Sequence, residues 1–238
     1  MKFTIANFKM NKTLAENKAW AEKLCELIYK NSKKIKSKIG CAPSFPYIKT
    51  MKDALYGTEI YVGAQNMYFE QKGAFTGEVS VSQLKDLGID FVIIGHSERR
   101  HIFGETNDLI KKKVSAALQN NILTILCVGE KLEERKSEKT FQVISNQLEA
   151  VPEKITNNML VIAYEPVWAI GTGIPAKKDQ IKEVIEFIKG KFDIPILYGG
   201  SIDEKVAEEI ADICDGGLVG SASLDPEKFF RICNAFER

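Results

Sequence analysis

Short apolar runs alternate with longer amphipathic segments along the chain, and this alternation restricts the possible folds more than any other feature. Several of the apolar runs are apolar at every position, as parallel strands are when both of their faces are covered. Segments with helical periodicity, such as residues 15–29 and 177–189, lie between them. About eight strand–helix units predict either an open doubly wound sheet or a closed (β/α)8 barrel. The strand-like runs are residues 3–8, 39–42, 60–64, 91–95, 123–128, 160–164, 196–198 and 217–219.

Polar and glycine residues gather where these runs end, and their distribution distinguishes the two folds. Asn7 and Lys9 follow the first run. His96 follows the fourth run and Glu165 the sixth, while glycine–serine clusters follow the last two. A barrel assembles its active site at the carboxyl ends of several strands, whereas a doubly wound sheet concentrates it at one or two loops. The sequence therefore predicts a single α/β domain over residues 1–238 with the (β/α)8-barrel fold.

Glu165 has the sequence surroundings of a catalytic base. It directly follows an apolar run, so its carboxylate is expected to emerge from a buried strand into a concave mouth, where partial desolvation would increase its basicity. The segment from Pro166 to Gly173 is apolar, carries Trp168 and contains glycine. Such a segment suits a lid that closes over substrate and excludes water. An ordinary solvated acid at a strand end is the alternative, which this apolar segment disfavours.

His96 and Lys9 are the other two candidate catalytic residues. The residues from Ser97 to Arg100 look like the first turn of a helix, and a helix N-terminus disfavours the imidazolium ion. His96 is therefore predicted to be a neutral imidazole that can donate a hydrogen bond to a substrate oxygen and shuttle its proton. Lys9 is expected at the same mouth, where a fixed cation would stabilise a developing oxyanion.

Two clusters of glycine and serine predict a phosphate-binding site. Any one glycine could simply belong to a turn. Clusters after consecutive strands, however, fit backbone N–H groups that surround a phosphate. The clusters are Gly199-Gly200-Ser201 and Gly220-Ser221.

Composition argues against several kinds of site and partner. The formal net charge of +1 gives no reason to expect a nucleic-acid or membrane partner. The five cysteines are widely spaced without a Cys-x-x-Cys pair, and there are only two histidines. Neither a disulfide framework nor a metal site is therefore predicted. No apolar run is long enough for a signal peptide or a membrane span, so a cytoplasmic protein is expected.

Several motifs make the sequence similar to the triosephosphate isomerase family almost from end to end. The longest and most specific match runs from Tyr164 to Gly173. The others include Asn7-Phe8-Lys9-Met10-Asn11, Gly63-Ala64-Gln65-Asn66, Gly73-Ala74-Phe75-Thr76-Gly77-Glu78, Gly95-His96-Ser97-Glu98-Arg99-Arg100, Cys127-Val128-Gly129-Glu130 and Tyr198-Gly199-Gly200-Ser201.

The resemblance implies a (β/α)8 TIM barrel that interconverts dihydroxyacetone phosphate and glyceraldehyde 3-phosphate without a cofactor. Glu165 would be the base that forms an enediolate, and His96 the neutral electrophile that moves protons between the two oxygens; this acid–base pairing is a known example for the family. Asn7 and Lys9 would bind substrate, and Glu98 would support the site beside His96. Main-chain groups at Gly171, Ser201, Gly220 and Ser221 would hold the phosphate.

The resemblance also implies a homodimer. The loop from Gly73 to Glu78 matches the family's third loop, which inserts into the partner subunit. Phe75 lies in this glycine-bounded loop, and an apolar side chain at a loop tip suggests burial by another surface. A loop that packs on its own domain is the alternative that the residues alone leave open.

The sequence departs from the family pattern at a few positions. Phe8 stands where tryptophan is usual, and Ser221 replaces a second glycine, which is compatible with an N–H donor only if no positive φ is required there. Ile174-Pro175 occupies the trailing hinge of the lid. Because proline fixes φ and removes a donor, we expect this hinge to affect lid opening more than chemistry.

Three other functions remain possible from the residues alone. A Schiff-base aldolase would use Lys9 as its nucleophile, although no apolar pocket around it is evident. A non-catalytic barrel could retain the phosphate pocket as a binding module, but it would not need Lys9, His96 and Glu165 together. A metal-dependent sugar-phosphate enzyme would require a ligand cluster that the sequence does not contain.

Overall fold

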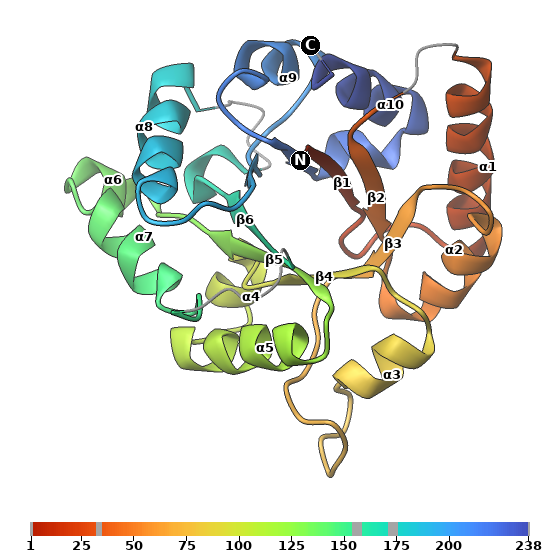
Figure 1. Cartoon of the computed structure of the whole chain (residues 1–238), viewed down its shortest axis with the longest axis horizontal. Helices are drawn as coiled ribbons and strands as arrows, with labels where there is room; N and C mark the ends of the chain where they lie inside the picture. Colours follow the sequence, from red (N-terminus) through yellow and green to blue (C-terminus); the bar gives the residue numbers. More distant parts are fainter. Residues whose placement is uncertain (1, 32–34, 154–158, 171–175, 238) are drawn as a thin grey trace.

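The computed structural model describes residues 2–31, 35–153, 159–170 and 176–237. Within these residues, eight parallel strands follow one another in chain order and close into a barrel (Figure 1). Closure is made by β1, which pairs with β8 on one side and with β2 on the other. The strands are β1 (Phe3–Asn7), β2 (Lys38–Ala42), β3 (Tyr61–Ala64), β4 (Phe91–Ile94), β5 (Leu123–Val128), β6 (Leu160–Tyr164), β7 (Ile196–Tyr198) and β8 (Gly216–Val219).

Helices surround this barrel on the outside, as Figure 1 shows. The predicted (β/α)8 barrel is therefore confirmed, and the open doubly wound sheet is excluded because β1 pairs with β8. The α-helices are α1 (Leu14–Lys30), α2 (Ile48–Ala54), α3 (Val81–Asp86), α4 (Ser97–His101), α5 (Asn107–Gln119), α6 (Leu132–Lys136), α7 (Thr140–Leu148), α8 (Lys178–Lys189), α9 (Glu204–Ile210) and α10 (Pro226–Ala235). Short 3₁₀ helices are η1 (Phe45–Tyr47), η2 (Val167–Ala169) and η3 (Ser221–Leu224).

The strand limits lie within one residue of those expected from the sequence, and at Gly95 the backbone conformation explains the difference. The fourth run was expected to include Gly95, but φ of Gly95 is +73° and turns the chain out of the strand. The final helix, α10, begins at an Asp-Pro pair, which is a sequence signal for a helix start. Asp225 caps it by accepting hydrogen bonds from the N–H groups of Glu227 and Lys228, with Pro226 in the first turn. No helix of the described residues is both long enough and apolar enough to cross a membrane.

Alternation along the strands divides the apolar residues into two cores. One core fills the barrel interior and includes Ile5, Ile93, Ala163 and Leu197. The other lies between the barrel and the helices and takes the intervening positions, such as Ile162. Because successive side chains of a strand point to opposite faces, each strand delivers every second residue to the interior.

The same alternation points to which residues reach the mouth of the barrel. Four residues each lie two positions after an interior residue: Asn7 after Ile5, Glu165 after Ala163, Gly199 after Leu197 and Gly220 after Leu218. All four lie at the carboxyl ends of their strands, where barrel enzymes build their active sites. The alternation that directs side chains into the barrel interior thus also directs these predicted site residues to the mouth of the barrel.

The ring of Phe91 occupies the barrel interior and requires glycine on the neighbouring strands. A Cβ atom added at Gly40 would lie 2.9 Å from the Cε1 atom of Phe91, and one added at Gly63 would overlap the same ring. Phe91 is fully buried, and its Cα is paired with that of Gly63 across β3 and β4. A large ring on β4 is therefore accommodated by glycines on β2 and β3.

We predict that Gly63→Ala destabilises the protein by about 1–3 kcal/mol, the usual cost of overpacking a core. Chemical denaturation of the wild type and the variant measures this difference. Gly190→Ala is the matched control, because Gly190 has an ordinary φ of −66°. An added Cβ there would meet nothing closer than 3.4 Å. Phe91→Leu should restore part of the stability lost in Gly63→Ala; equal stability of Gly63→Ala and wild type would contradict this packing.

Candidate active site

A pocket of about 530 Å³ opens at the carboxyl ends of the strands. Its lining brings together residues from β1, the β4–α4 junction, β6 and the loops after β7 and β8. The predicted site residues in this lining are Asn7, Lys9, His96, Glu165, Ser201, Gly220 and Ser221. Gly171, the remaining predicted residue, lies outside the described residues.

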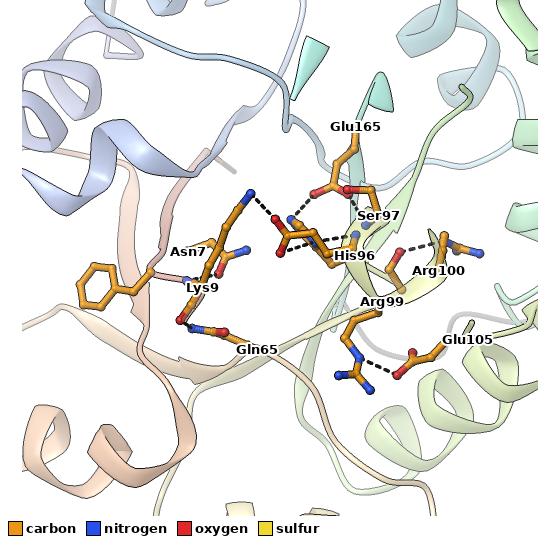
Figure 2. A network of polar contacts seen from close by, with 12 residues as sticks. Asn7, Lys9, Gln65, His96, Ser97, Arg99, Arg100, Glu105 and Glu165 are labelled. Carbon is orange, nitrogen blue, oxygen red and sulfur yellow. Dashed lines mark hydrogen bonds and ion pairs between the residues drawn. The ribbon is translucent and has the colours of Figure 1, made fainter. Parts of the chain in front are cut away.

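Glu165 is buried to 1% exposure at the floor of this pocket. Its main-chain N–H donates to the carbonyl of Val128 at 2.7 Å, which fixes it to the end of β5. One carboxylate oxygen, Oε2, accepts a hydrogen bond from the N–H of Ser97 at 2.9 Å. The other, Oε1, lies 3.2 Å from Nε2 of His96 (Figure 2). Two contacts thus orient the carboxylate, the Ser97 N–H on Oε2 and the His96 ring beside Oε1.

Two glycines make room for Glu165, a role that the sequence did not reveal. A Cβ added at Gly199 would lie 2.7 Å from Cγ of Glu165, and one added at Gly129 would overlap its main-chain carbonyl oxygen. Gly199 was expected only as part of a phosphate-binding cluster. Its position shows that the cluster after β7 also shapes the site of the carboxylate.

Cys127 contributes a thiol to the barrel interior close to Glu165. It is fully buried on β5. Burial raises its pKa well above the ordinary value, and the negative charge of Glu165 and a hydrogen bond to that residue act in the same direction. The thiol therefore stays protonated, and no thiolate competes with the carboxylate for a proton.

His96 caps the N-terminus of α4 with its own ring. Nδ1 accepts a hydrogen bond from the N–H of Glu98 at 3.2 Å. A nitrogen that accepts a hydrogen bond carries no proton, so this contact favours the neutral imidazole with its proton on Nε2. Nε2 is the nitrogen that faces Glu165. The predicted helix N-terminus after His96 is confirmed by α4, which begins at Ser97.

Lys9 reaches the pocket from a strained turn after β1. Its φ is +51°, in a region that residues other than glycine seldom occupy. Its carbonyl accepts hydrogen bonds from the Ser44 hydroxyl at 3.0 Å and the Gln65 side chain at 2.8 Å. Its own N–H donates to Oδ1 of Asn7 at 3.0 Å. These three contacts hold the backbone of Lys9 in place, and Figure 2 shows the side chain of Gln65 beside Lys9.

The ammonium group of Lys9 forms an ion pair with Glu98. Nζ lies 2.7 Å from Oε1 of Glu98, and the two side chains are 26% and 38% exposed. An ion-paired ammonium group lacks the lone pair that a Schiff-base nucleophile needs. The aldolase alternative therefore has little support from this geometry.

The loops after β7 and β8 form the opposite wall of the pocket. Ser221 begins η3, and its φ is not positive. Serine therefore replaces glycine at this position without backbone strain. Ser201 is already engaged, since its N–H and its hydroxyl donate to the carbonyl of Ala169 at 3.0 and 2.7 Å. This pair of bonds ties the β7 loop to η2.

The predicted lid is described only at its two ends. At its start, Nε1 of Trp168 donates to Oε1 of Glu130 at 3.4 Å. At its end, the N–H of Ala176 donates to the hydroxyl of Tyr198 at 3.2 Å. Burial raises the pKa of Tyr198 to about 12, so this hydroxyl remains neutral. The hinge residues Ile174 and Pro175 lie outside the described residues.

Metal ligands are not gathered in the described part of the chain. No group of three or more His, Cys, Asp or Glu residues there has the arrangement to hold a metal ion. The residues that line the pocket are suited instead to proton transfer and to anion binding.

Comparison with known proteins identifies the family. The family model described as triosephosphate isomerase matches residues 2–236. The triosephosphate isomerase of Aquifex aeolicus is 42% identical, with 97% of this chain and 98% of that protein covered. The enzymes of that name from Alkaliphilus oremlandii and Finegoldia magna are 41% and 44% identical, and in both cases 96% of each chain is covered. The chain therefore belongs to the triosephosphate isomerase family.

Proposed function

We propose that the protein is a triosephosphate isomerase, which interconverts dihydroxyacetone phosphate and D-glyceraldehyde 3-phosphate in glycolysis and gluconeogenesis. The observation that carries this proposal is the buried carboxylate of Glu165 facing Nε2 of His96 at 3.2 Å inside a pocket that also contains Lys9. Base, hydrogen-bond donor and cation thus converge on one small volume. This arrangement supports an enzyme that removes a proton from carbon better than a module that only binds phosphate.

In the proposed reaction, Glu165 removes a proton from the carbon next to the substrate carbonyl. The electrons of that C–H bond form a carbon–carbon double bond, and those of the carbonyl π bond move onto its oxygen, which gives an enediolate. Glu165 then returns the proton to the neighbouring carbon, while a proton moves between the two oxygens. Substrate and product are isomers, so these proton transfers balance the reaction without a cofactor.

His96 and Lys9 are proposed to stabilise the enediolate. The Nε2–H group of a neutral His96 can donate to either substrate oxygen and pass its proton between them. Lys9 adds a fixed positive charge, which favours the developing oxyanion in a pocket screened from water. The ion pair with Glu98 holds the Lys9 ammonium on the His96 side of the site.

The phosphate of the substrate is proposed to bind at the loops after β7 and β8. Gly220 and Ser221 stand at the start of η3, where the first N–H groups of a helix lack partners within it. Gly171 and Ser201 are proposed to complete this anion site, which requires Ser201 to exchange its bonds to the carbonyl of Ala169 for the phosphate. Asn7 is proposed to contact substrate beside Lys9. Of these, Asn7, Ser201, Gly220 and Ser221 line the same pocket as Glu165.

The protein is further proposed to be a single-domain cytoplasmic enzyme that forms a homodimer. The loop that contains Gly73 and Glu78 projects away from the barrel between β3 and α3 in Figure 1. Phe75 on this loop is 40% exposed, and Met10, Ile102 and Phe103 are 95%, 72% and 64% exposed. A partner subunit that covered these side chains would remove their apolar surface from water, which is the driving force proposed for the dimer.

We predict that Glu165→Gln lowers kcat by about 10²–10⁴-fold, the usual contribution of a positioned general base. The amide keeps the shape of the side chain but cannot accept the substrate proton. A coupled isomerase assay compares this variant with wild type and with Glu22→Gln, an exposed substitution on α1. Comparable turnover of wild type and Glu165→Gln would contradict the proposed mechanism.

For the dimer, we predict that Phe75→Glu shifts the protein from dimer to monomer, because a charge at a buried interface is costly. Sedimentation velocity measures the shift. Phe141→Glu is the matched control: Phe141 is also 40% exposed and also packs on one aromatic ring. A dimer that persists unchanged in Phe75→Glu, or a wild type that is monomeric, would contradict the proposed interface.

A further inference from the structure

Arg100 binds the main chain at the ends of two neighbouring strands. Its Nε donates to the carbonyl of Gly95 at 2.7 Å, and its Nη2 donates to the carbonyl of Cys127 at 2.9 Å. The third nitrogen, Nη1, donates to Oδ1 of Asn107 at the start of α5. Each nitrogen of the guanidinium group therefore has a protein acceptor, which fixes its orientation.

The two carbonyls stand where the β4–β5 ladder stops. The last paired residues are Ile94 and Leu126, so the next pair in register would be Gly95 and Cys127. Gly95 has φ of +73° and leaves the strand at this point. The guanidinium group bridges the two carbonyls that follow the last rung, and its planar fork suits two acceptors at once.

One residue next to these carbonyls belongs to the proposed acid–base pair, and the other binds the main chain of its second member. His96 directly follows Gly95. Val128 directly follows Cys127, and its carbonyl accepts the main-chain N–H of Glu165 at 2.7 Å. Figure 2 shows Arg100 near the turn that carries His96 and Ser97. The 3.2 Å separation of His96 and Glu165 thus depends on two strand ends that Arg100 holds together.

The surroundings of Arg100 show that this contact is specific. An added Cβ at Gly95 would lie 2.9 Å from Nη2 of Arg100 and 3.3 Å from the carbonyl oxygen of Cys127, so the turn is packed closely against the group. Burial lowers the pKa of Arg100, while the negative charges of Glu165 and Glu105 oppose that effect. The neighbouring Arg99 has a different role, since its Nε bonds to Glu105.

We propose that Arg100 is a positioning residue for catalysis, which sets the distance between His96 and Glu165 by clamping the ends of β4 and β5. The inference rests on the proposed isomerase function and extends it to a residue that does not line the pocket. Small displacements of reacting groups are costly, because about 1 Å of misplacement can reduce a rate by about 10²-fold. The loops proposed to bind phosphate lie on other strands, so substrate affinity should change little.

The decisive variant is Arg100→Lys, which keeps the positive charge but loses the fork. We expect kcat to fall at least about tenfold while KM stays within about threefold, given the steep dependence of rate on alignment. Arg100→Gln, which also loses the charge, should show a fall at least as large. Asn107→Ala is the matched control: it removes the third bond of the guanidinium group and leaves both carbonyl contacts, so its kcat should stay within about twofold.

A second readout separates positioning from stability and does not depend on turnover. The chain has only two histidines, so ¹⁵N NMR of the imidazoles, with His101→Gln for assignment, reports directly on His96. We expect the His96 signals to shift or broaden in Arg100→Lys but not in Asn107→Ala. Wild-type kcat and wild-type His96 signals in Arg100→Lys, with only a lower Tm, would overturn the proposal. Absence of isomerase activity in the wild type would instead overturn the proposed function, while the NMR comparison would still test the clamp.

Discussion

The structure depends on the pairing of β1 with β8, because this pairing converts a twisted sheet into a closed barrel. Phe3 lies opposite Gly216 in this pair, and its N–H donates to the carbonyl of Asp215 at 2.8 Å. Gly216 has φ of +126°, and a Cβ there would overlap the carbonyl of Phe3. Only glycine allows the two backbones to approach so closely. Once the barrel is closed, the inward-facing residues of all eight strands share one interior.

Closure has a chemical consequence at the carboxyl ends of the strands. Ala163 and Leu197 face the barrel interior, so Glu165 and Gly199, two positions further along their strands, reach the same mouth. The absence of a side chain at Gly199 leaves the space that the Glu165 side chain occupies. Glu165 is held by the carbonyl of Val128 at the end of β5 and by the N–H of Ser97 at the start of α4. Among the described residues, no Lys or Arg forms an ion pair with its carboxylate. His96 is oriented by the same first turn of α4, through the N–H of Glu98. The proposed reacting groups are thus placed by barrel architecture, which would cost little reorganisation when substrate binds.

Much of this arrangement could be predicted from the sequence, because fully apolar strands and polar strand ends are local signals. The strand limits, the cap at Asp225 and the gathering of Lys9, His96 and Glu165 followed from such signals and from the family resemblance. The positive φ of Lys9 and the bridge made by Arg100 could not, because they depend on contacts between residues far apart in the chain. Gln65 and Lys9, for example, are separated by 56 positions. Sequence shows that Gln65 ends a strand, but only the folded barrel shows which carbonyl it holds.

In the proposed reaction, one carboxylate moves a proton between two adjacent carbons of a triose phosphate through an enediolate. A protonated carboxylic acid can exchange its proton with solvent before it returns one to the substrate. The most direct test is to convert dihydroxyacetone phosphate in D₂O with the wild-type protein and to record ¹H NMR spectra of the product early in the reaction. We expect deuterium on the carbon next to the aldehyde in part of the glyceraldehyde 3-phosphate. Product that carries no deuterium at that carbon would contradict it, since the hydrogen would then have passed directly from carbon to carbon.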